Sequence, residues 1–498
     1  MKLIRNKKIG TSILNVVLVM VVAVVLVACH DEDDVDFVAP QITIDSPTPG
    51  SNVTSLLVLI SGTVSSDVTL VELTVKQDIN DVGTTITATL AGTSFSGNVT
   101  LLPGINYISA MARDAIGNRN TITFELHYPQ LSLTDGQAAT LVIGQADFTS
   151  NAANRGSTPS ANTLSGVQGA LFENGNTILY VPDSGNNRVL GFNAIPTVLD
   201  TSANFVIGQI DFTTVSAGTS ATQLTAPSSI FTTTDKTFVA DTGNNRVLIW
   251  NSLVTSGTVN ADNVIGQLDL TSAATSCSSS TLSVPTSVFV VNDKVVVLDK
   301  GNHRVLIWNA IPTMDGVAAD VVIGQVGASA MDTCAANDSD GNGVTDALTA
   351  STLNNPGGIW TDGTRLLIAD TDNNRVLVWD TFPTANGEAA TRVIGQANMT
   401  SSAAPAPPTQ SSLNAPKSVA SNGNQIVVAD SGNTRALIFN TFPATDGEPA
   451  ANVIGQDNFV TTGTGTTDTR MTSYDSVYVD RTRLFVVDGN RILMFVNP

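Results

Sequence analysis

A short pattern that recurs six times constrains the fold of this chain more than any other feature of its sequence. The stretch at residues 240–251, ADTGNNRVLIWN, places an acid, two amides and a base in front of an apolar run. The other copies are PDSGNNRVLGFN from residue 182, LDKGNHRVLIWN from 298, ADTDNNRVLVWD from 369, ADSGNTRALIFN from 429 and a shorter VDGNRILMFVN from 487. Their leading acids are 58, 58, 71, 60 and 58 residues apart, and a regular period of this length is typical of a repeat architecture.

A second pattern, VIGQ, recurs in step with the first. Its copies are LVIGQADF from residue 141, FVIGQIDF from 205, NVIGQLDL from 263, VVIGQVGA from 321, RVIGQANM from 392 and NVIGQDNF from 452. Each unit also holds two further strand-like runs, for example TSVFVV and KVVVLD within residues 286–299. Units of four short strands that repeat radially form a β-propeller, so the sequence predicts an all-β fold with a six-bladed β-propeller over residues 130–498.

The order of these elements predicts how the ring closes. The repeat region begins with a VIGQ strand at residues 139–145 and ends with the strand of the first pattern at residues 491–496, so the last unit lacks a VIGQ strand of its own. We expect the early strand to complete the last blade, because pairing of the two chain ends removes the sheet edges that invite aggregation.

Residues 40–129 have a different pattern of short alternating or β-branched runs, such as QITIDSP, LVELTVK and NTITFELHY, separated by turn residues. About seven strands in this length suit an antiparallel β-sandwich. The segment resembles bacterial Ig-like domains, including the Asp-x-x-Gly-Asn hairpin at residues 114–118. In such proteins the module is usually a spacer, and the resemblance implies an Ig-like β-sandwich spacer in front of the propeller.

The first 28 residues have the pattern of a signal peptide, with a basic start and an apolar core that ends in LVAC. This tetrapeptide resembles the bacterial lipobox, which implies that Cys29 is lipidated and anchors the mature chain to a membrane. An uncleaved transmembrane helix is the alternative, although the run of 16 residues from Ile13 to Ala28 is short for a span of about 20. The acidic residues 29–39 then form a tether, and His30 after Cys29 favours the outer membrane of a Gram-negative bacterium, with surface exposure left open.

The charge of the chain argues against nucleic acid as a partner. The whole sequence has 23 Lys and Arg against 43 Asp and Glu. Four of the bases and none of the acids lie before Cys29, so the remainder has 23 − 4 = 19 bases and a net charge of 19 − 43 = −24. A surface of this charge repels phosphate backbones.

The recurring Asp-[Ser/Thr]-Gly-Asn-Asn-Arg-Val-Leu stretch, placed after a VAD strand, is similar to the NHL-repeat signature. The VIGQ-x-D-F strand resembles a bacterial subgroup of secreted NHL propellers. The resemblance covers residues 131–498 and implies a six-bladed propeller. Because NHL propellers serve both as binding scaffolds and as enzymes, the fold does not by itself decide the function.

The repeated acid and base are interpreted as structural, because an active site in a ring normally breaks the symmetry of the repeats. An acid at the end of one strand and a base at the start of the next can pair across the hairpin. These residues are Asp183 and Arg188, Asp241 and Arg246, Asp299 and Arg304, Asp370 and Arg375, Asp430 and Arg435, and Asp488 and Arg491.

Function is therefore expected where the repeats differ, above all in the long variable loops that follow each VIGQ strand. Loops of this kind on a rigid ring are a natural binding surface, here for an unidentified protein or glycan. Their Ser, Thr, Asn and Ala content is suited to polar contacts with a partner, and it is equally suited to loops that only face solvent.

One of these loops contains DSDGNGVTD, which matches a calcium-loop template. The spacing converges alternate oxygens on one hard cation, and the sequence predicts the ligands Asp338, Asp340, Asn342, Val344 and Asp346. The loop resembles EF-hand-like and dockerin-like loops. Position 12 is Thr349, so the usual bidentate acid is absent, and we expect one structural Ca²⁺ of low affinity. The alternative is a polar loop without an ion.

Cys277 and Cys334 lie at equivalent places after neighbouring VIGQ strands, and they are predicted to form a disulfide in an oxidising compartment. Two free thiols are the alternative.

Catalytic residues are not predicted. Of the three histidines, His30 lies in the tether, His127 lies in the sandwich, and His303 replaces an Asn of the repeat. The chain has no Gly-x-Ser-x-Gly elbow and no phosphate-binding loop. The sequence thus favours a monomeric, non-catalytic binding scaffold. The alternatives are a metal-dependent hydrolase or lactonase with oxygen ligands in the propeller channel, and a purely structural envelope component.

Overall fold

The computed structural model describes residues 39–53, 57–76, 83–102, 104–128, 130–169, 172–173, 178–255, 259–327, 332, 334–480 and 482–497. The predicted signal peptide, Cys29 and nearly all of the tether lie outside the described residues. None of the helices in the described ranges has the length and apolar character needed to cross a membrane.

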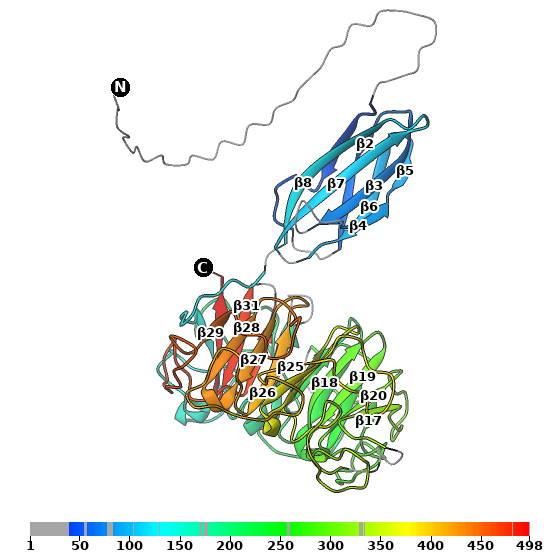
Figure 1. The fold of residues 1–498 in the computed structure, drawn as a ribbon. Coiled ribbons are helices and arrows are strands. Elements are labelled where there is room, and N and C mark those ends of the chain that lie inside the picture. The colour runs from blue at the N-terminus through cyan, green and yellow to red at the C-terminus, as the bar shows by residue number, and fades with distance from the viewer. Residues whose placement is uncertain are drawn as a thin grey trace, which may run out of the picture.

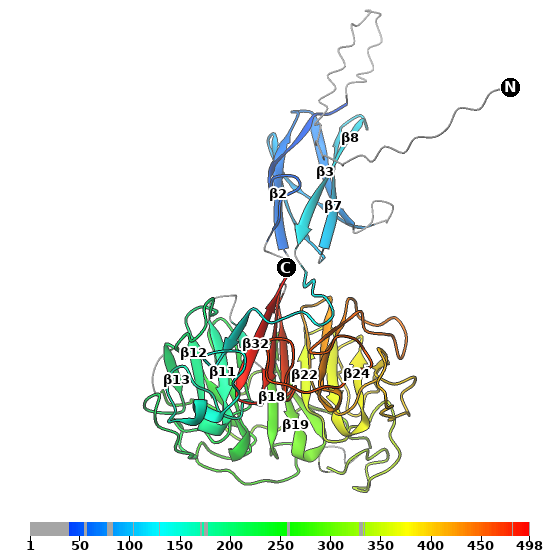
Figure 2. The ribbon, with the colours of Figure 1, turned by 90° about the vertical axis from the view of Figure 1, so that its left-hand side faces the viewer.

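Residues 42–128 form two four-stranded antiparallel sheets (Figures 1 and 2). One sheet has the order β1 (Ile42–Ser46), β2 (Leu57–Val64), β6 (Ser94–Thr100) and β5 (Thr89–Ala91). The other has the order β4 (Thr84–Thr87), β3 (Val68–Lys76), β7 (Gly104–Asp114) and β8 (Arg119–Tyr128). Alternate residues of β2 and β7 are buried, which is the period-two pattern of strands that face a core on one side. The described residues of this segment form eight strands, where the sequence suggested about seven.

The remainder forms six four-stranded antiparallel sheets, which are the blades of a β-propeller. Their strands, from blade one to blade six, are β10 (Phe172–Glu173), β11 (Leu179–Asp183), β12 (Arg188–Phe192) and β13 (Phe205–Ile207); β14 (Ser229–Thr232), β15 (Thr237–Asp241), β16 (Arg246–Trp250) and β17 (Asn263–Ile265); β18 (Pro285–Val291), β19 (Lys294–Asp299), β20 (Arg304–Trp308) and β21 (Val321–Ile323); β22 (Gly358–Thr361), β23 (Leu366–Asp370), β24 (Arg375–Trp379) and β25 (Arg392–Ile394); β26 (Pro416–Ser421), β27 (Ile426–Asp430), β28 (Arg435–Phe439) and β29 (Asn452–Ile454); and β30 (Ser476–Val479), β31 (Arg483–Asp488), β32 (Arg491–Val496) and β9 (Leu141–Ile143).

The second and third strands of each blade are mostly apolar along their length, because neighbouring blades cover both of their faces. In blade two, every residue of β15 and β16 is buried. Six hydrophobic clusters hold these side chains, and each cluster lies between two neighbouring blades. The large aromatic residue of the third strand, such as Trp250, is 1% exposed and belongs to such a cluster.

The predicted closure of the ring is confirmed. β9 pairs with β32 in antiparallel register, with Leu493 opposite Val142. One cluster then joins blade six to blade one, since it contains Ile143 and Ile492 together with Leu179 and Leu190.

The two faces of the propeller differ in what they carry. One face has the connections between the first and second strands, together with the segment that arrives from the sandwich. There the Leu131 N–H donates to Gln425 Oε1 at 3.0 Å, and Asn497 Nδ2 donates to the Gln130 carbonyl at 2.8 Å. The opposite face has the repeated turns between the second and third strands and the long loops after each VIGQ strand, and we call it the loop-rich face. Figure 2 shows β32 running away from that face toward the C-terminus.

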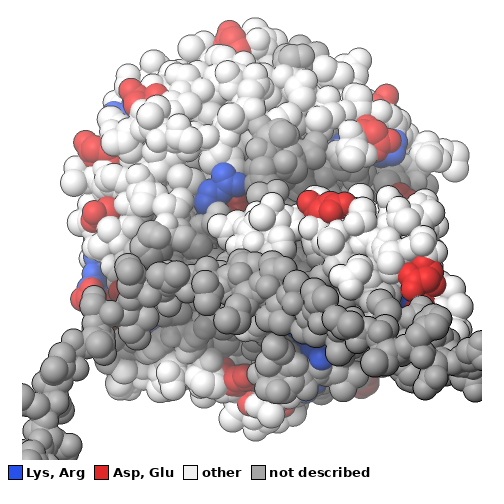
Figure 3. Space-filling model, turned by 90° about the horizontal axis from the view of Figure 1, so that it is seen from above, with Lys and Arg blue, Asp and Glu red and all other residues white. Residues whose placement is uncertain are grey.

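The described residues visible from above in Figure 3 are largely uncharged, with separate acidic side chains and a few basic ones. The sequence agrees with this view, since 13% of its residues are charged.

Candidate functional site

The repeated turns of the loop-rich face place an Asp and an Arg opposite each other at the ends of paired strands. In blade one, Asp183 and Arg188 are cross-strand neighbours, and Arg188 Nε donates to Asp183 Oδ2 at 2.7 Å. A one-turn 3-10 helix, η2 (Ser184–Asn186), and the left-handed residue Asn187 at φ 52° reverse the chain between them. The same turn recurs as η3 (Thr242–Asn244), η4 (Lys300–Asn302), η5 (Thr371–Asn373) and η6 (Ser431–Asn433), and blade six uses a shorter turn.

All six pairs are fully buried, with both side chains 0% exposed. Their remaining hydrogen bonds go to loops. Arg188 also donates to the carbonyls of Ser160 and Thr163 in the preceding loop and of Phe212 in the following loop. Asp183 Oδ1 accepts the Ser165 N–H at 2.7 Å. Burial raises the pKa of this Asp, while the charge of Arg188 acts in the opposite direction. Each pair therefore ties one turn to two neighbouring loops.

The Gln of each VIGQ strand makes a second set of hydrogen bonds between a turn and a loop. The sequence analysis did not predict these bonds. Gln267 Nε2 donates to the carbonyl of Asn245 in the turn and to the carbonyl of Ala274 in the following loop, each at 2.8 Å. The other Gln residues of this position make corresponding bonds, namely Gln145, Gln209, Gln325, Gln396 and Gln456. Recurrence was the available signal, but the acceptors are backbone carbonyls of variable loops, which the sequence pattern does not reveal.

The left-handed residue of the turn connects successive blades. Asn245 Oδ1 accepts the N–H of Val284 at 2.9 Å, and in blade three His303 takes the same role, because its Nδ1 accepts the N–H of Asn355 at 2.8 Å. An Nδ1 that accepts a hydrogen bond requires the neutral ring with its proton on Nε2. Burial lowers the pKa of His303, in agreement with this geometry. His303 thus performs the structural task of the Asn that it replaces.

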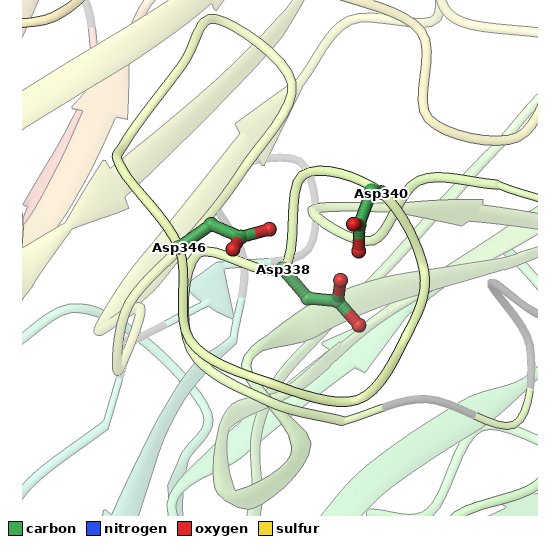
Figure 4. A group of neighbouring side chains, drawn as sticks. All are labelled: Asp338, Asp340 and Asp346. Atoms are coloured by element: carbon green, nitrogen blue, oxygen red, sulfur yellow. The ribbon is translucent and has the colours of Figure 1, made fainter.

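The structure brings together three of the five predicted calcium ligands. Oxygen atoms of Asp338, Asp340 and Asp346 all lie within 4.8 Å of one another, and Figure 4 shows their carboxylates pointing into one loop. Asp338 is 0% exposed, and its two oxygens accept the N–H groups of Gly341 at 2.7 Å and Gly343 at 2.9 Å.

The other two predicted ligands would contribute an amide oxygen and, at position 7 of the template, a backbone carbonyl oxygen. Asn342 Oδ1 accepts the N–H of Val344 at 2.8 Å, and Val344 is 60% exposed. Three convergent carboxylates form an oxygen-only donor set, which is the chemistry that Ca²⁺ prefers. Among the His, Cys, Asp and Glu side chains of the described residues, these three form a group close enough to hold a metal ion.

Cys277 and Cys334 are joined by a disulfide, with Cα atoms 6.2 Å apart. The bond links the loop before blade three to the loop before blade four. The loop that contains the predicted calcium ligands is therefore covalently connected to its neighbour. His127 lies in β8 beside Glu125, with Nε2 and Oε2 3.3 Å apart. Lipidation of Cys29 concerns a residue outside the described part of the chain.

Comparisons with known proteins leave both the family and the activity of this chain open. No family model matches the chain, and no curated protein matches it. A putative oxidoreductase (glucose dehydrogenase) from Thermus thermophilus is 12% identical, with a TM-score of 0.36, over 67% of this chain and 98% of that one. A putative 6-phosphogluconolactonase from Bacteroides uniformis is 13% identical, with a TM-score of 0.31, over 80% of this chain and 98% of that one.

A modular endo-β-1,4-mannanase from Cellulomonas fimi is 21% identical over 18% of this chain, with a TM-score of 0.15. This match covers 18% of the mannanase chain, and a match to an engineered protein covers 20% of that protein. The chain is therefore described by its own architecture, an all-β protein whose larger part is a six-bladed, propeller-like ring of four-stranded sheets.

Proposed function

We propose that this protein is a non-catalytic binding scaffold of the bacterial cell envelope, with an NHL-type propeller that engages a protein or glycan through its loop-rich face. The observation that carries the proposal is that the two faces differ: one holds ordered loops, and the other is attached to the linker. The buried Asp and Arg pairs hold the long loops of the loop-rich face in place, while the linker from the sandwich is bonded to the opposite face. The loop-rich face is thus both organised and left accessible by the linker.

The proposal also includes attachment of the N-terminal region to a membrane. Lipidation of Cys29 would tether the chain to the outer membrane, and residues 40–129, as an Ig-like spacer, would hold the propeller away from it. Cells that express the wild-type chain or Cys29→Ser, fed an alkyne-bearing fatty acid, test this point. Labelled wild-type protein in the outer-membrane fraction and an unlabelled variant are expected; equal labelling of both would contradict the anchor.

The alternative, a metal-dependent hydrolase or lactonase, needs oxygen ligands gathered in the channel. Within the described residues, the carboxylate group that meets the distance requirement for a metal lies instead in the loop of residues 338–346. This group would hold the structural calcium ion of the proposed scaffold.

Site-specific photo-crosslinking tests the binding face. A photoreactive amino acid is placed at Ala217, an exposed residue of the loop before blade two, and the control carries it at Thr234, an exposed residue of the strand connection on the opposite face. In cells, the Ala217 variant is expected to give a discrete crosslinked product that the Thr234 variant does not give. Equal products from both positions, or none from Ala217, would contradict the proposed face.

Metal content tests the calcium loop. Elemental analysis of the full-length protein in detergent is expected to find one calcium ion per chain, and Asp338→Asn together with Asp340→Asn should remove it. A metal ion that persists in this variant would lie elsewhere and would favour the enzyme alternative.

A further inference from the structure

The two arginines of the sandwich differ from the arginines of the propeller. Each arginine in the described part of the propeller forms an ion pair with an Asp. Arg113 and Arg119 are exposed, and within the described residues no hydrogen bond or ion pair reaches either guanidinium group. They are direct cross-strand partners in β7 and β8, so two like charges lie opposite each other. Like charges in this position destabilise a strand pair, and an acidic partner would offset the repulsion.

An apolar turn joins these two arginines. Asp114 begins the turn, and its Oδ1 accepts the N–H groups of Gly117 at 2.7 Å and Asn118 at 2.8 Å. The turn presents Ile116, which is 64% exposed. We call residues 113–119 the β7–β8 tip, and it combines two unpaired cations with an exposed apolar side chain.

The chain that precedes the sandwich enters at the same end. Asn120 Nδ2 donates to the Pro40 carbonyl at 2.9 Å, so Pro40 lies beside the start of β8. The linker to the propeller leaves from the other end, because β8 has 10 residues at about 3.4 Å each and ends at Tyr128. The β7–β8 tip and the incoming chain therefore share the end of the sandwich that is remote from the linker.

The segment before Pro40 has a composition that complements the tip. Residues 31–38 read DEDDVDFV, with five acids and no base. Asp36 is four residues before Pro40, and four extended residues span at most about 14 Å. Phe37 and two valines in the same segment provide apolar side chains. Because this segment belongs to the same chain, it meets the tip at a high effective concentration.

We propose that the acidic segment 31–38 docks on the β7–β8 tip, with its carboxylates paired to Arg113 and Arg119 and its apolar side chains against Ile116. The inference goes beyond the proposed function, because it requires neither a lipid anchor nor a partner at the loop-rich face. Its basis is the direct opposition of two unpaired arginines, the exposed apolar turn and the entry of an acidic chain at the same end. The contact would hold the sandwich in one orientation on its tether, and salt would weaken it by screening the charges.

Carbodiimide coupling tests the contact on the full-length protein in detergent. Arg119→Lys keeps the positive charge and provides an amine that this reagent joins to a carboxylate in direct contact. Thr123→Lys is the matched control, because Thr123 is exposed on the same face of β8 and lies about 14 Å further from the tip. Peptide mapping at low salt is expected to find Arg119→Lys joined to the acids of residues 31–36, with little such coupling in Thr123→Lys. The coupling should fall at about 1 M salt, where the Debye length is about 3 Å.

Three results of the coupling experiment would overturn the proposal. One is coupling of Arg119→Lys only to carboxylates of the sandwich itself, such as Glu72 of β3 or Asp67 in front of it. Another is coupling to residues 31–36 that is no more frequent than in Thr123→Lys. The third is a crosslink that joins ordinary and isotope-labelled chains in a mixture, which would assign the tip to a second copy.

Proteolysis provides the second readout. An endoprotease that cleaves after acidic residues should cut residues 31–36 at least about twofold faster in Arg113→Ser with Arg119→Ser than in the wild type, because two exposed ion pairs are lost. Lys76→Ser removes a cation at the far end of β3 and should leave the rate unchanged. Equal rates in all three proteins would contradict the docking. A difference that appears only in vesicles with anionic lipid would also contradict it, and would assign the tip to the membrane surface. The Ala217 crosslinking result is independent, so a failure here would leave the proposed binding face intact.

Discussion

Removal of one buried carboxylate should show what the repeated ion pairs contribute. In blade four, Asp370 accepts hydrogen bonds from Arg375 Nε at 2.7 Å, from the Asn354 N–H at 2.7 Å and from Asn373 Nδ2 at 2.8 Å. Arg375 is 0% exposed. Asp370→Ala therefore leaves a guanidinium group in the interior with carbonyl acceptors and no counter-charge. Loss of one partner of a buried pair costs about 3–5 kcal/mol, and we expect the free energy of unfolding to fall by that amount.

The same blade offers a matched control. Asp380 pairs with Arg392 at 3.1 Å, but both side chains are about one-third exposed. An exposed pair contributes about 0–1 kcal/mol, so Asp380→Ala should change stability little. Urea unfolding followed by tryptophan fluorescence is the appropriate assay, because all tryptophans of the chain lie in the propeller, namely Trp250, Trp308, Trp360 and Trp379.

Two outcomes would contradict a structural role of the Asp370 and Arg375 pair. If Asp370→Ala and Asp380→Ala unfolded within about 1 kcal/mol of each other, the buried pair would not tie the loops as its contacts indicate. If Asp370→Ala instead kept its stability and abolished partner crosslinking at Ala217, the pair would belong to a binding site and its structural interpretation would be wrong.

Three further predictions follow from the contacts of the loop-rich face. Burial lowers the pKa of His303 from 6.5, so its contribution to stability is present above that value and is lost as the pH falls through the lower, folded-state pKa; urea titrations from about pH 5 to about pH 8 should show this slope in the wild type and a flatter one in His303→Asn. Cys277→Ser with Cys334→Ser opens a loop of 57 residues and should cost about 4 kcal/mol in the chain-entropy model, and equal stability of oxidised wild type and variant would contradict it. Calcium should raise the melting temperature of the wild type, and Asp338→Asn should abolish that response; a response retained by the variant would assign the ion to another site.

Much of the architecture could be predicted because the repeats encode it locally. Apolar periodicity and turn residues defined four strands per unit, and the order of the two patterns indicated that β9 closes the last blade. The recurring aromatic position packs between blades, where Trp250 and its equivalents are buried. The sequence placed all five predicted calcium ligands in one loop, and the structure brings the carboxylates of Asp338, Asp340 and Asp346 together there.

What the sequence determined by itself is the set of features that depend on near neighbours in the chain, namely the strands, the turns and the cross-strand Asp and Arg pairs. What only the tertiary structure decided is which distant groups meet at the loop-rich face. The carbonyl acceptors of Arg188 and Gln267 come from loops of variable sequence. These contacts arise because closure of the ring brings one edge of every blade to the same channel and the same face, a placement that no local pattern records.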